Sequence, residues 1–304
     1  MSIDVRRHLA LLSAFLLAAC SQKAAVASEH ADHASPAADT HTPSSQAPSD
    51  TSIPPAGQDA KARLAASPRH GEWVMIPVGG SPADSVRAWV VYPERSTKAP
   101  VVVVVHEIFG LTTWVRAVAD QLAADGFIAI APDLLTGKHI PTVGPDSINT
   151  DSAIAAIRTL DPNEVQRRLS AAAKYGMALP AALPRYGIVG FCWGGSVSFA
   201  HAVAAPDLGA SVVYYGTSPK TEDLAKVRAP VLGLYGQNDA RVTSTIPPAD
   251  SALHALGRTY EHFVFPGAGH GFLRAQNGQN GANFAAAKQA WPKTIAWFRK
   301  YLGG

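Results

Sequence analysis

The stretch "GIVGFCWGGS", residues 187–196, has the spacing of a nucleophile elbow, with Cys192 at the position of the nucleophile. In an elbow, a sharp strand-to-helix turn holds the nucleophile in a strained conformation, and small residues two positions before and after let the chain pass closely. Gly190 and Gly194 fill those positions. The N-terminus of the following helix also favours a thiolate. Cys192 is therefore a candidate nucleophile, the alternative being a small apolar residue buried in a glycine-rich turn.

A nucleophile of this kind needs a histidine that moves protons and an acid that orients the histidine. The stretch "VLGLYGQNDARV" places Asp239 just after an expected strand, and "VFPGAGHGF" places His270 in a glycine-rich loop after the next one. Taken singly, the first reads as a turn aspartate and the second as a loop histidine. With Cys192 they follow the chain order nucleophile, acid, histidine, which predicts an acyl-transfer triad at one edge of a parallel sheet.

Strand and helix patterns alternate along the rest of the chain, which predicts an α/β fold with a mostly parallel sheet and helices on both faces. The run "VVVVVHE", residues 101–107, is typical of a strand buried on both faces. Asp161, followed by proline and by Glu164, predicts the start of a helix that runs to about residue 178. Other helices are expected over about 114–124 and 283–302, the last kinked or broken near Pro292. Further strands are expected at "GFIAIAPDLL", "YGIVGF", "ASVVYYG", "APVLGLYG" and "EHFVFPG".

The length of 304 residues and a net charge of +3 without basic blocks fit one globular domain, expected over residues 69–304. Nucleic-acid binding requires Lys and Arg clustered on one face, and the sequence gives no sign of such a cluster. We expect a monomer that acts on a small molecule. His30, Asp32, His33 and His41 could bind a metal only weakly, because no fixed geometry holds them together.

The N-terminus predicts export and lipid attachment. Arg6 and Arg7 precede an apolar run of about eleven residues, the length of a signal-peptide core and too short to span a bilayer. Residues 17–20, Leu-Ala-Ala-Cys, resemble a bacterial lipobox, so we expect a signal peptide over residues 1–19 and a lipid on Cys20; the alternative is a chance cysteine in an ordinary secretory signal. Ser21 after Cys20 favours the outer membrane, facing the periplasm. Residues 20–68, rich in Ala, Ser and Pro, are expected to form a disordered tether.

Five motifs together resemble the dienelactone hydrolase (carboxymethylenebutenolidase) family over nearly all of the part after the tether. They are "HEIFGL", "GFIAIAPDLL", "GFCWGG", "VLGLYGQND" and "FPGAGHGF". The resemblance implies an α/β-hydrolase fold without a cap domain. It also implies that a Cys192-Asp239-His270 triad opens a lactone or ester bond through a thioester, without a cofactor.

The resemblance assigns roles to further positions. Glu107 looks like the family's glutamate that contacts the nucleophile and holds or takes its proton; the alternative is a solvated carboxylate, which the apolar neighbours disfavour. The backbone N–H groups of Ile108 and Trp193 would form the oxyanion hole. Arg274, four residues after His270, matches a substrate-binding arginine, which would grip a substrate carboxylate; the alternative is a surface arginine.

The resemblance is weaker over residues 136–162, where the family has much of its substrate-contacting surface. Arg158 is the single arginine of this segment, inside an expected helix, and we assign it no role. Two functional classes therefore compete. One is an envelope hydrolase of lactones, with carboxylesterases or thioesterases as its nearest variants; the other is a non-catalytic binding or structural protein on a hydrolase fold. The four residues Cys192, Asp239, His270 and Glu107 favour the first, since packing alone does not require all of them.

Overall fold

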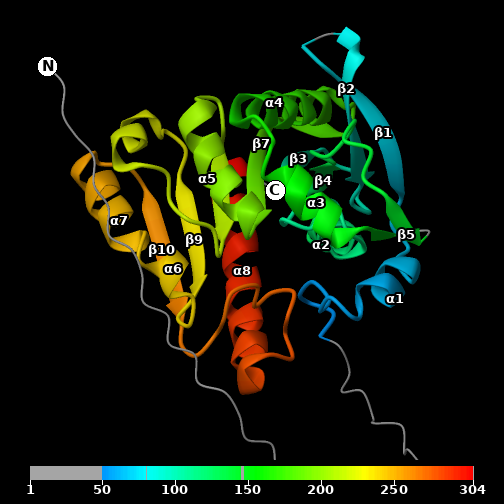
Figure 1. Ribbon diagram of the computed structural model, residues 1–304. Coiled ribbons are helices and arrows are strands. Elements are labelled where there is room, and N and C mark those ends of the chain that lie inside the picture. Colours follow the sequence, from blue (N-terminus) through cyan, green and yellow to red (C-terminus); the bar gives the residue numbers. More distant parts are fainter. Residues whose placement is uncertain (1–49, 80, 145–146, 304) are drawn as a thin grey trace, which may run out of the picture. The chain divides into compact units, whose positions relative to one another are not determined.

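An eight-stranded sheet is the centre of the chain in the computed structural model, which describes residues 50–79, 81–144 and 147–303. The strand order is β1-β2-β4-β3-β7-β8-β9-β10 (Figure 1). The strands from β4 to β10 are parallel, whereas β2 runs antiparallel to both β1 and β4. The predicted mostly parallel α/β sheet is confirmed. The strands are β1 (Gly71–Val78), β2 (Ser81–Val91), β3 (Ala99–Val105), β4 (Ile128–Pro132), β7 (Ala182–Phe191), β8 (Ala210–Tyr214), β9 (Val231–Gly236) and β10 (Tyr260–Phe265).

Helices cover both faces of this sheet. One face packs against α2 and α8, with α1 lying on α2, and the other packs against α4, α5 and α7. A separate two-stranded sheet of β5 (Thr142–Gly144) and β6 (Ser147–Ile148) leads into α3. The helices are α1 (Ala60–Ala65), α2 (Thr113–Ala124), α3 (Thr150–Ile157), α4 (Pro162–Ala178), α5 (Trp193–Ala204), α6 (Ala240–Thr243), α7 (Ile246–Ala255) and α8 (Ala282–Leu302), with 3₁₀ turns η1 (Thr221–Lys226) and η2 (Gln279–Gly281).

Strand β3 shows why its sequence is an unbroken valine run. Every residue of the strand is buried. Val102 and Val104 join the core that faces α2 and α8, while Val101, Val103 and Val105 join the core on the other face. Side chains alternate across a strand, so a central strand covered on both faces needs apolar residues at every position.

Helix α4 begins where the sequence predicts. The Asp161 side chain accepts hydrogen bonds from the backbone N–H groups of Asn163 and Glu164, and Pro162 occupies the first turn. The Glu164 carboxylate does not complete a capping box; it binds Arg168, with Oε1 lying 2.7 Å from Nε. Helix α8 continues through Pro292 as one helix, so of the predicted kink or break the break is wrong.

The predicted tether extends too far into the domain. Residues 53–56 are buried, with Ile53 only 1% exposed, and helix α1 packs on α2. This segment was missed because one isoleucine among Pro, Ala and Gly has no apolar period, and a helix of six residues is too short to show one. The signal peptide, Cys20, and the group of His30, Asp32, His33 and His41 lie outside the described residues.

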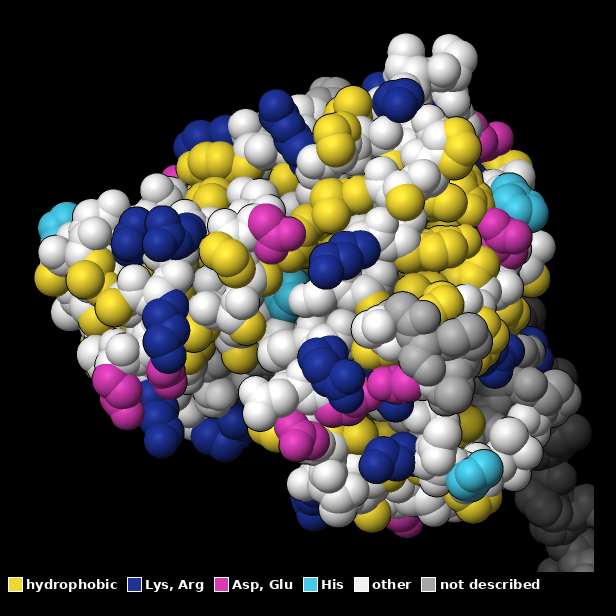
Figure 2. Space-filling model, turned by 90° about the horizontal axis from the view of Figure 1, so that it is seen from above, with side chains coloured by type: hydrophobic (Ala, Val, Ile, Leu, Met, Phe, Trp, Pro, Cys, Tyr) yellow, Lys and Arg dark blue, Asp and Glu magenta, His cyan; other side chains and the backbone are white. Residues whose placement is uncertain are grey.

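Charges are mixed on the face in Figure 2, where Lys and Arg side chains lie among Asp and Glu and gather into no continuous band. Within the described part of the chain, no helix combines the length and the apolar character needed to cross a bilayer.

Candidate active site

Cys192 lies in a strained turn between β7 and α5. Its backbone has φ 58° and ψ −118°, a region that residues other than glycine rarely adopt. The two flanking glycines are required by space: a Cβ on Gly190 would lie 1.8 Å from the Gly194 carbonyl oxygen, and one on Gly194 would lie 2.3 Å from the His106 carbonyl oxygen. The geometry is that of a nucleophile elbow.

Asp239 and His270 follow the ends of β9 and β10, at the same edge of the sheet as the elbow. His270 Nδ1 lies 2.5 Å from Asp239 Oδ2. The carboxylate accepts a hydrogen bond from the Nδ1–H group, which leaves Nε2 as the nitrogen that can exchange protons. No hydrogen bond joins His270 to Cys192 in the described part of the chain, so the pair is assembled but the thiol is not yet engaged.

Two backbone N–H groups act on the Cys192 sulfur and lower its pKa, against the larger effect of burial. They belong to Trp193, the first residue of α5, and to Ile108, in the loop after β3. These are the donors that the sequence assigns to an oxyanion hole. The loop is held by a turn in which the Gly110 N–H donates to the Glu107 carbonyl at 3.1 Å, with Gly110 at φ 78°.

His106 also holds the loop after β3 in place, through hydrogen bonds of both its ring nitrogens. The Leu134 N–H donates to His106 Nε2 at 3.2 Å, so Nδ1 carries the proton and donates to the Glu107 carbonyl oxygen at 2.8 Å. Burial lowers the pKa of His106, which favours this neutral form. Its ring stacks on Trp193 with centroids 5.5 Å apart. His106 therefore links β3, the loop after β4 and the start of α5.

Glu107 is 1% exposed and forms an ion pair with Arg274, with Oε2 lying 2.7 Å from Nε. Burial raises the pKa of the carboxyl to about 7, although the Arg274 charge opposes this. The solvated alternative for Glu107 is excluded. No hydrogen bond joins Glu107 to the Cys192 sulfur among the described residues, so the predicted contact is electrostatic.

The Cys192 thiol is not a preformed thiolate. Burial and the nearby Glu107 charge raise its pKa and outweigh the two N–H groups that lower it. The helix N-terminus does lower the pKa of the thiol, as expected, but burial raises that pKa by more. A reaction that used this sulfur as nucleophile would therefore need a base to take its proton.

A cavity of about 440 Å³ adjoins this cluster. Glu107 and Arg274 form its charged part, and Phe109, Trp114 and Ile148 supply apolar walls. The Arg274 guanidinium lies 5.1 Å from the centre of the Phe109 ring. The cavity is large enough for a small organic molecule and holds one cationic group next to apolar surface.

Tyr215 also lies at this site, and the sequence analysis did not predict it. It follows β8, has φ 39°, and is fully buried with its ring 5.2 Å from that of His270. Its hydroxyl has no hydrogen-bond partner in the described part of the chain, and its pKa is raised by burial and then by the charge of Glu107. Its place directly after a strand end was the available signal, but a tyrosine among valines resembles ordinary core.

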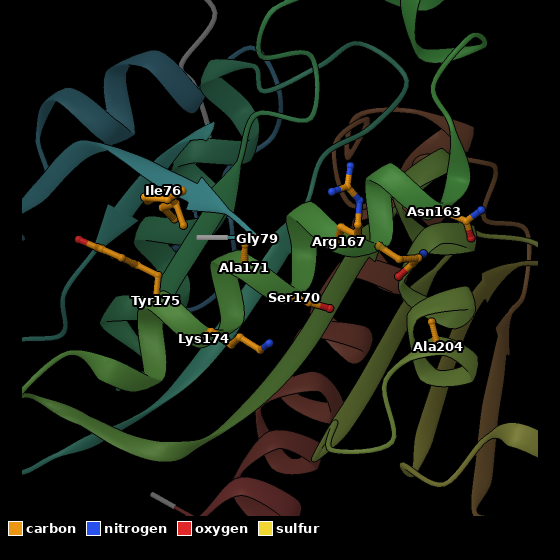
Figure 3. A pocket seen from close by; sticks show the side chains of 11 residues that line it. Ile76, Gly79, Asn163, Arg167, Ser170, Ala171, Lys174, Tyr175 and Ala204 are labelled. Carbon is orange, nitrogen blue, oxygen red and sulfur yellow. The ribbon is translucent and has the colours of Figure 1, made fainter. Parts of the chain in front are cut away.

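A larger cavity, about 960 Å³, lies away from this cluster. Arg167, Ser170, Lys174 and Tyr175 line it from α4, and Ile76 lines it from β1 (Figure 3). None of the candidate catalytic residues lines it. Arg158, at the end of α3, is exposed and lines neither cavity. Among residues 50–79, 81–144 and 147–303, no three His, Cys, Asp or Glu side chains are grouped to hold a metal.

Comparison with known proteins identifies close relatives of this arrangement. A model of the dienelactone hydrolase family matches residues 86–302. A protein of Salmonella typhimurium named "Putative carboxymethylenebutenolidase" is 34% identical over 235 residues, which cover 73% of this chain and 86% of that protein. A Bradyrhizobium protein named "Probable 2-oxo-3-(5-oxofuran-2-ylidene)propanoate lactonase" is 30% identical over 248 residues, 77% of this chain and 95% of the relative.

A solved structure with the same family name has a similar fold. The crystal structure of a protein from Klebsiella pneumoniae, titled "Putative Dienelactone Hydrolase", superposes with a TM-score of 0.67 at 29% identity. The match covers 77% of this chain and 99% of that one.

The raised pKa of Glu107 predicts a pH-dependent stability. The folded state binds this proton more tightly than the unfolded chain, whose pKa is about 4.5, so the stability it confers is complete below that pH and is lost as pH rises through about 7. In urea denaturation, Glu107→Gln should match wild type near pH 4 and exceed it near pH 8 by up to about 3 kcal/mol. A difference that stays the same at both pH values would contradict the buried carboxyl.

Proposed function

This chain belongs to the dienelactone hydrolase family and is a hydrolase of ester or lactone bonds, and on that basis we propose that Cys192, His270 and Asp239 carry the reaction. The observation that supports this most is the convergence at one sheet edge of the strained Cys192, the His270–Asp239 pair and two N–H groups directed at the sulfur. Acyl transfer needs these three parts together.

The proposed reaction begins with the thiol proton, which moves to Glu107 or His270. The thiolate attacks the carbonyl carbon, and the Ile108 and Trp193 N–H groups stabilise the charge on the carbonyl oxygen. The C–O bond then breaks, and whichever group took the thiol proton, His270 or Glu107, gives it to the leaving oxygen. Water, deprotonated by His270, releases the acid from the thioester and restores the thiol. Asp239 keeps the histidine in the tautomer that serves both steps.

We propose that the substrate carries a carboxylate near its scissile bond. Arg274 is already paired with Glu107, and the described residues that line the cavity include no second cation. A substrate carboxylate on Arg274 would compete with Glu107 and leave a buried anion without its partner. Glu107 would then gain by taking the nearby thiol proton, so binding of an acidic substrate and formation of the thiolate would be coupled.

We also propose that Cys20 is lipidated and that the enzyme acts at the bacterial envelope. The support is the sequence alone, in which Leu17 to Cys20 follow a short apolar run with two N-terminal arginines.

Variants of the three reacting residues test the proposed chemistry. Cys192→Ala should abolish lactone and aryl-ester hydrolysis, and Cys192→Ser should retain the fold with a trace of activity, because serine is the poorer nucleophile at neutral pH. His270→Ala should lower kcat by about 10³-fold or more, and Asp239→Asn by somewhat less. Iodoacetamide should inactivate a Cys20→Ser protein while labelling Cys192. An unchanged kcat in His270→Ala would exclude the triad.

Arg274→Ala tests the acidic substrate. Relative to neutral aryl esters, loss of the guanidinium should reduce kcat/KM about thirtyfold or more for carboxylate-bearing lactones, since breaking a desolvated charge pair costs about 2–5 kcal/mol. Arg241→Ala is the matched control: it removes an exposed positive charge that acts on Cys192 from a distance. Equal losses on both kinds of substrate would mean that Arg274 supports its loop and not the ligand.

Cell fractionation tests the anchor. In a bacterial host the wild-type protein should be found in the membrane fraction, and Cys20→Ser should move it to soluble or unprocessed pools, because the lipid is the proposed attachment. A wild-type protein that is already soluble in the periplasm would refute lipidation.

A further inference from the structure

A short segment before α1 lies beside the candidate active site. We call residues Ile53–Gly57 the N-terminal strap. They lie outside the part of the chain that matches the family model, residues 86–302. Figure 1 shows the start of the described chain, in blue, next to the orange loop between β10 and α8.

Three hydrogen bonds fasten the strap. The Gln276 side-chain amide donates to the Pro54 carbonyl at 2.8 Å, and the Trp114 indole N–H donates to the Pro55 carbonyl at 3.0 Å; both bonds are buried. The Gly57 N–H donates to the Arg274 carbonyl oxygen at 2.8 Å. Two of the three partners therefore lie on the loop that carries Arg274. Proline supplies no N–H but keeps its carbonyl, so the Pro54–Pro55 pair presents acceptors in a stiff backbone.

Gly57 also packs against the Arg274 side chain. A Cβ at this position would lie 3.1 Å from Arg274 Cγ and 3.7 Å from Cδ. The first distance is shorter than ordinary van der Waals contact, so any larger residue would push the arginine stem. At its other end the guanidinium lies between the Glu107 carboxylate and the Phe109 ring. The strap thus restrains the stem of Arg274, and the position of the guanidinium decides which anion it can bind.

The strap also forms part of the cavity wall. Gly57 lines the space of about 440 Å³ together with Glu107, Phe109 and Arg274. Ile53, 1% exposed, belongs to the core formed with α2 and α8, and so anchors the strap in packed surroundings. A wall made of a glycine between a buried anchor and a short helix leaves room for a ligand next to Arg274.

We propose that the N-terminal strap is a specificity element that positions Arg274 and shapes the wall of its cavity for a carboxylate-bearing ligand. The proposal rests on the carboxylate-binding role given to Arg274 above. The strap is a positioning element, because it acts through the arginine and touches no reacting atom.

The test uses two alkylating reagents of the same shape. Iodoacetate carries a carboxylate and iodoacetamide a neutral amide, and each forms an S–C bond with the Cys192 sulfur as iodide leaves. The ratio of their rate constants, divided by the ratio for free cysteine, measures attraction of a carboxylate to the site. The protein carries Cys20→Ser, so Cys192 is its one thiol. Intact mass and labelling rate are readable without turnover, so failure of the hydrolytic proposal would not affect the reading.

The strap variants form a graded series. Wild type should favour iodoacetate, and Gly57→Val should lower the normalised ratio about tenfold, with Gly57→Ala between them, because each step pushes the Arg274 stem further. For a carboxylate-bearing lactone, KM should rise with the same order while kcat for a neutral aryl ester stays unchanged. Gln58→Ala, an exposed neighbour whose amide contacts Asp59, is the matched control and should behave as wild type.

A double-mutant cycle separates positioning from blocking. In an Arg274→Ala background, Gly57→Val should change the ratio by less than about twofold, because the group through which it acts is gone. The same tenfold loss in that background would overturn the proposal, as would no preference for iodoacetate in wild type. An unchanged ratio in Gly57→Val would also overturn it. Thermal unfolding confirms that each variant is folded, and Gly57→Ala gives the result if Gly57→Val does not fold.

Discussion

The Glu107 carboxyl lies almost completely out of water at the end of β3, with Arg274 as its ionic partner. Desolvation penalises its charge, and the arginine offsets only part of that penalty, so the pKa stays raised. Burial raises the pKa of the Cys192 thiol, and the negative charge of Glu107 raises it further. The ionisation of the candidate nucleophile therefore depends in part on a carboxyl group of another loop.

The backbone at the elbow imposes the second constraint. A Cβ on Gly190 or Gly194 would overlap backbone oxygens. The oxygens that a Cβ on Gly194 would meet belong to Val105, the last residue of β3, and to His106. The turn is therefore packed directly against the strand that ends in Glu107. This contact brings the Ile108 N–H to the sulfur beside that of Trp193, while His106 holds its loop through the bond with Leu134. The parallel sheet supplies the remaining parts because β9 and β10 end at the same edge.

Local features were predictable from the sequence, and long-range pairings were not. The elbow at Cys192, the N-cap at Asp161 and the strand-end positions of Asp239 and His270 depend on neighbours in the chain. The Glu107–Arg274 ion pair joins segments far apart, and no spacing rule connects them without the fold or a resemblance. Tyr215 follows a strand end as Asp239 does, yet an aromatic residue in an apolar run gives no sign of catalytic surroundings. The strap could not be predicted, because its composition is typical of disordered segments. Two of its hydrogen bonds are accepted by backbone carbonyls, which every sequence has.

The two parts of the site are therefore encoded differently. The groups proposed to react lie in residues 86–302, the part shared with the family, where strand ends and tight turns leave little freedom. The position of Arg274 also depends on the strap before that part, which contacts the arginine through one backbone hydrogen bond and one glycine. A change in the strap can move the anion-binding group without touching the elbow or the His270–Asp239 pair. Under the proposed function, a chain of this family could change its substrate through its N-terminal segment while keeping the acyl-transfer chemistry intact.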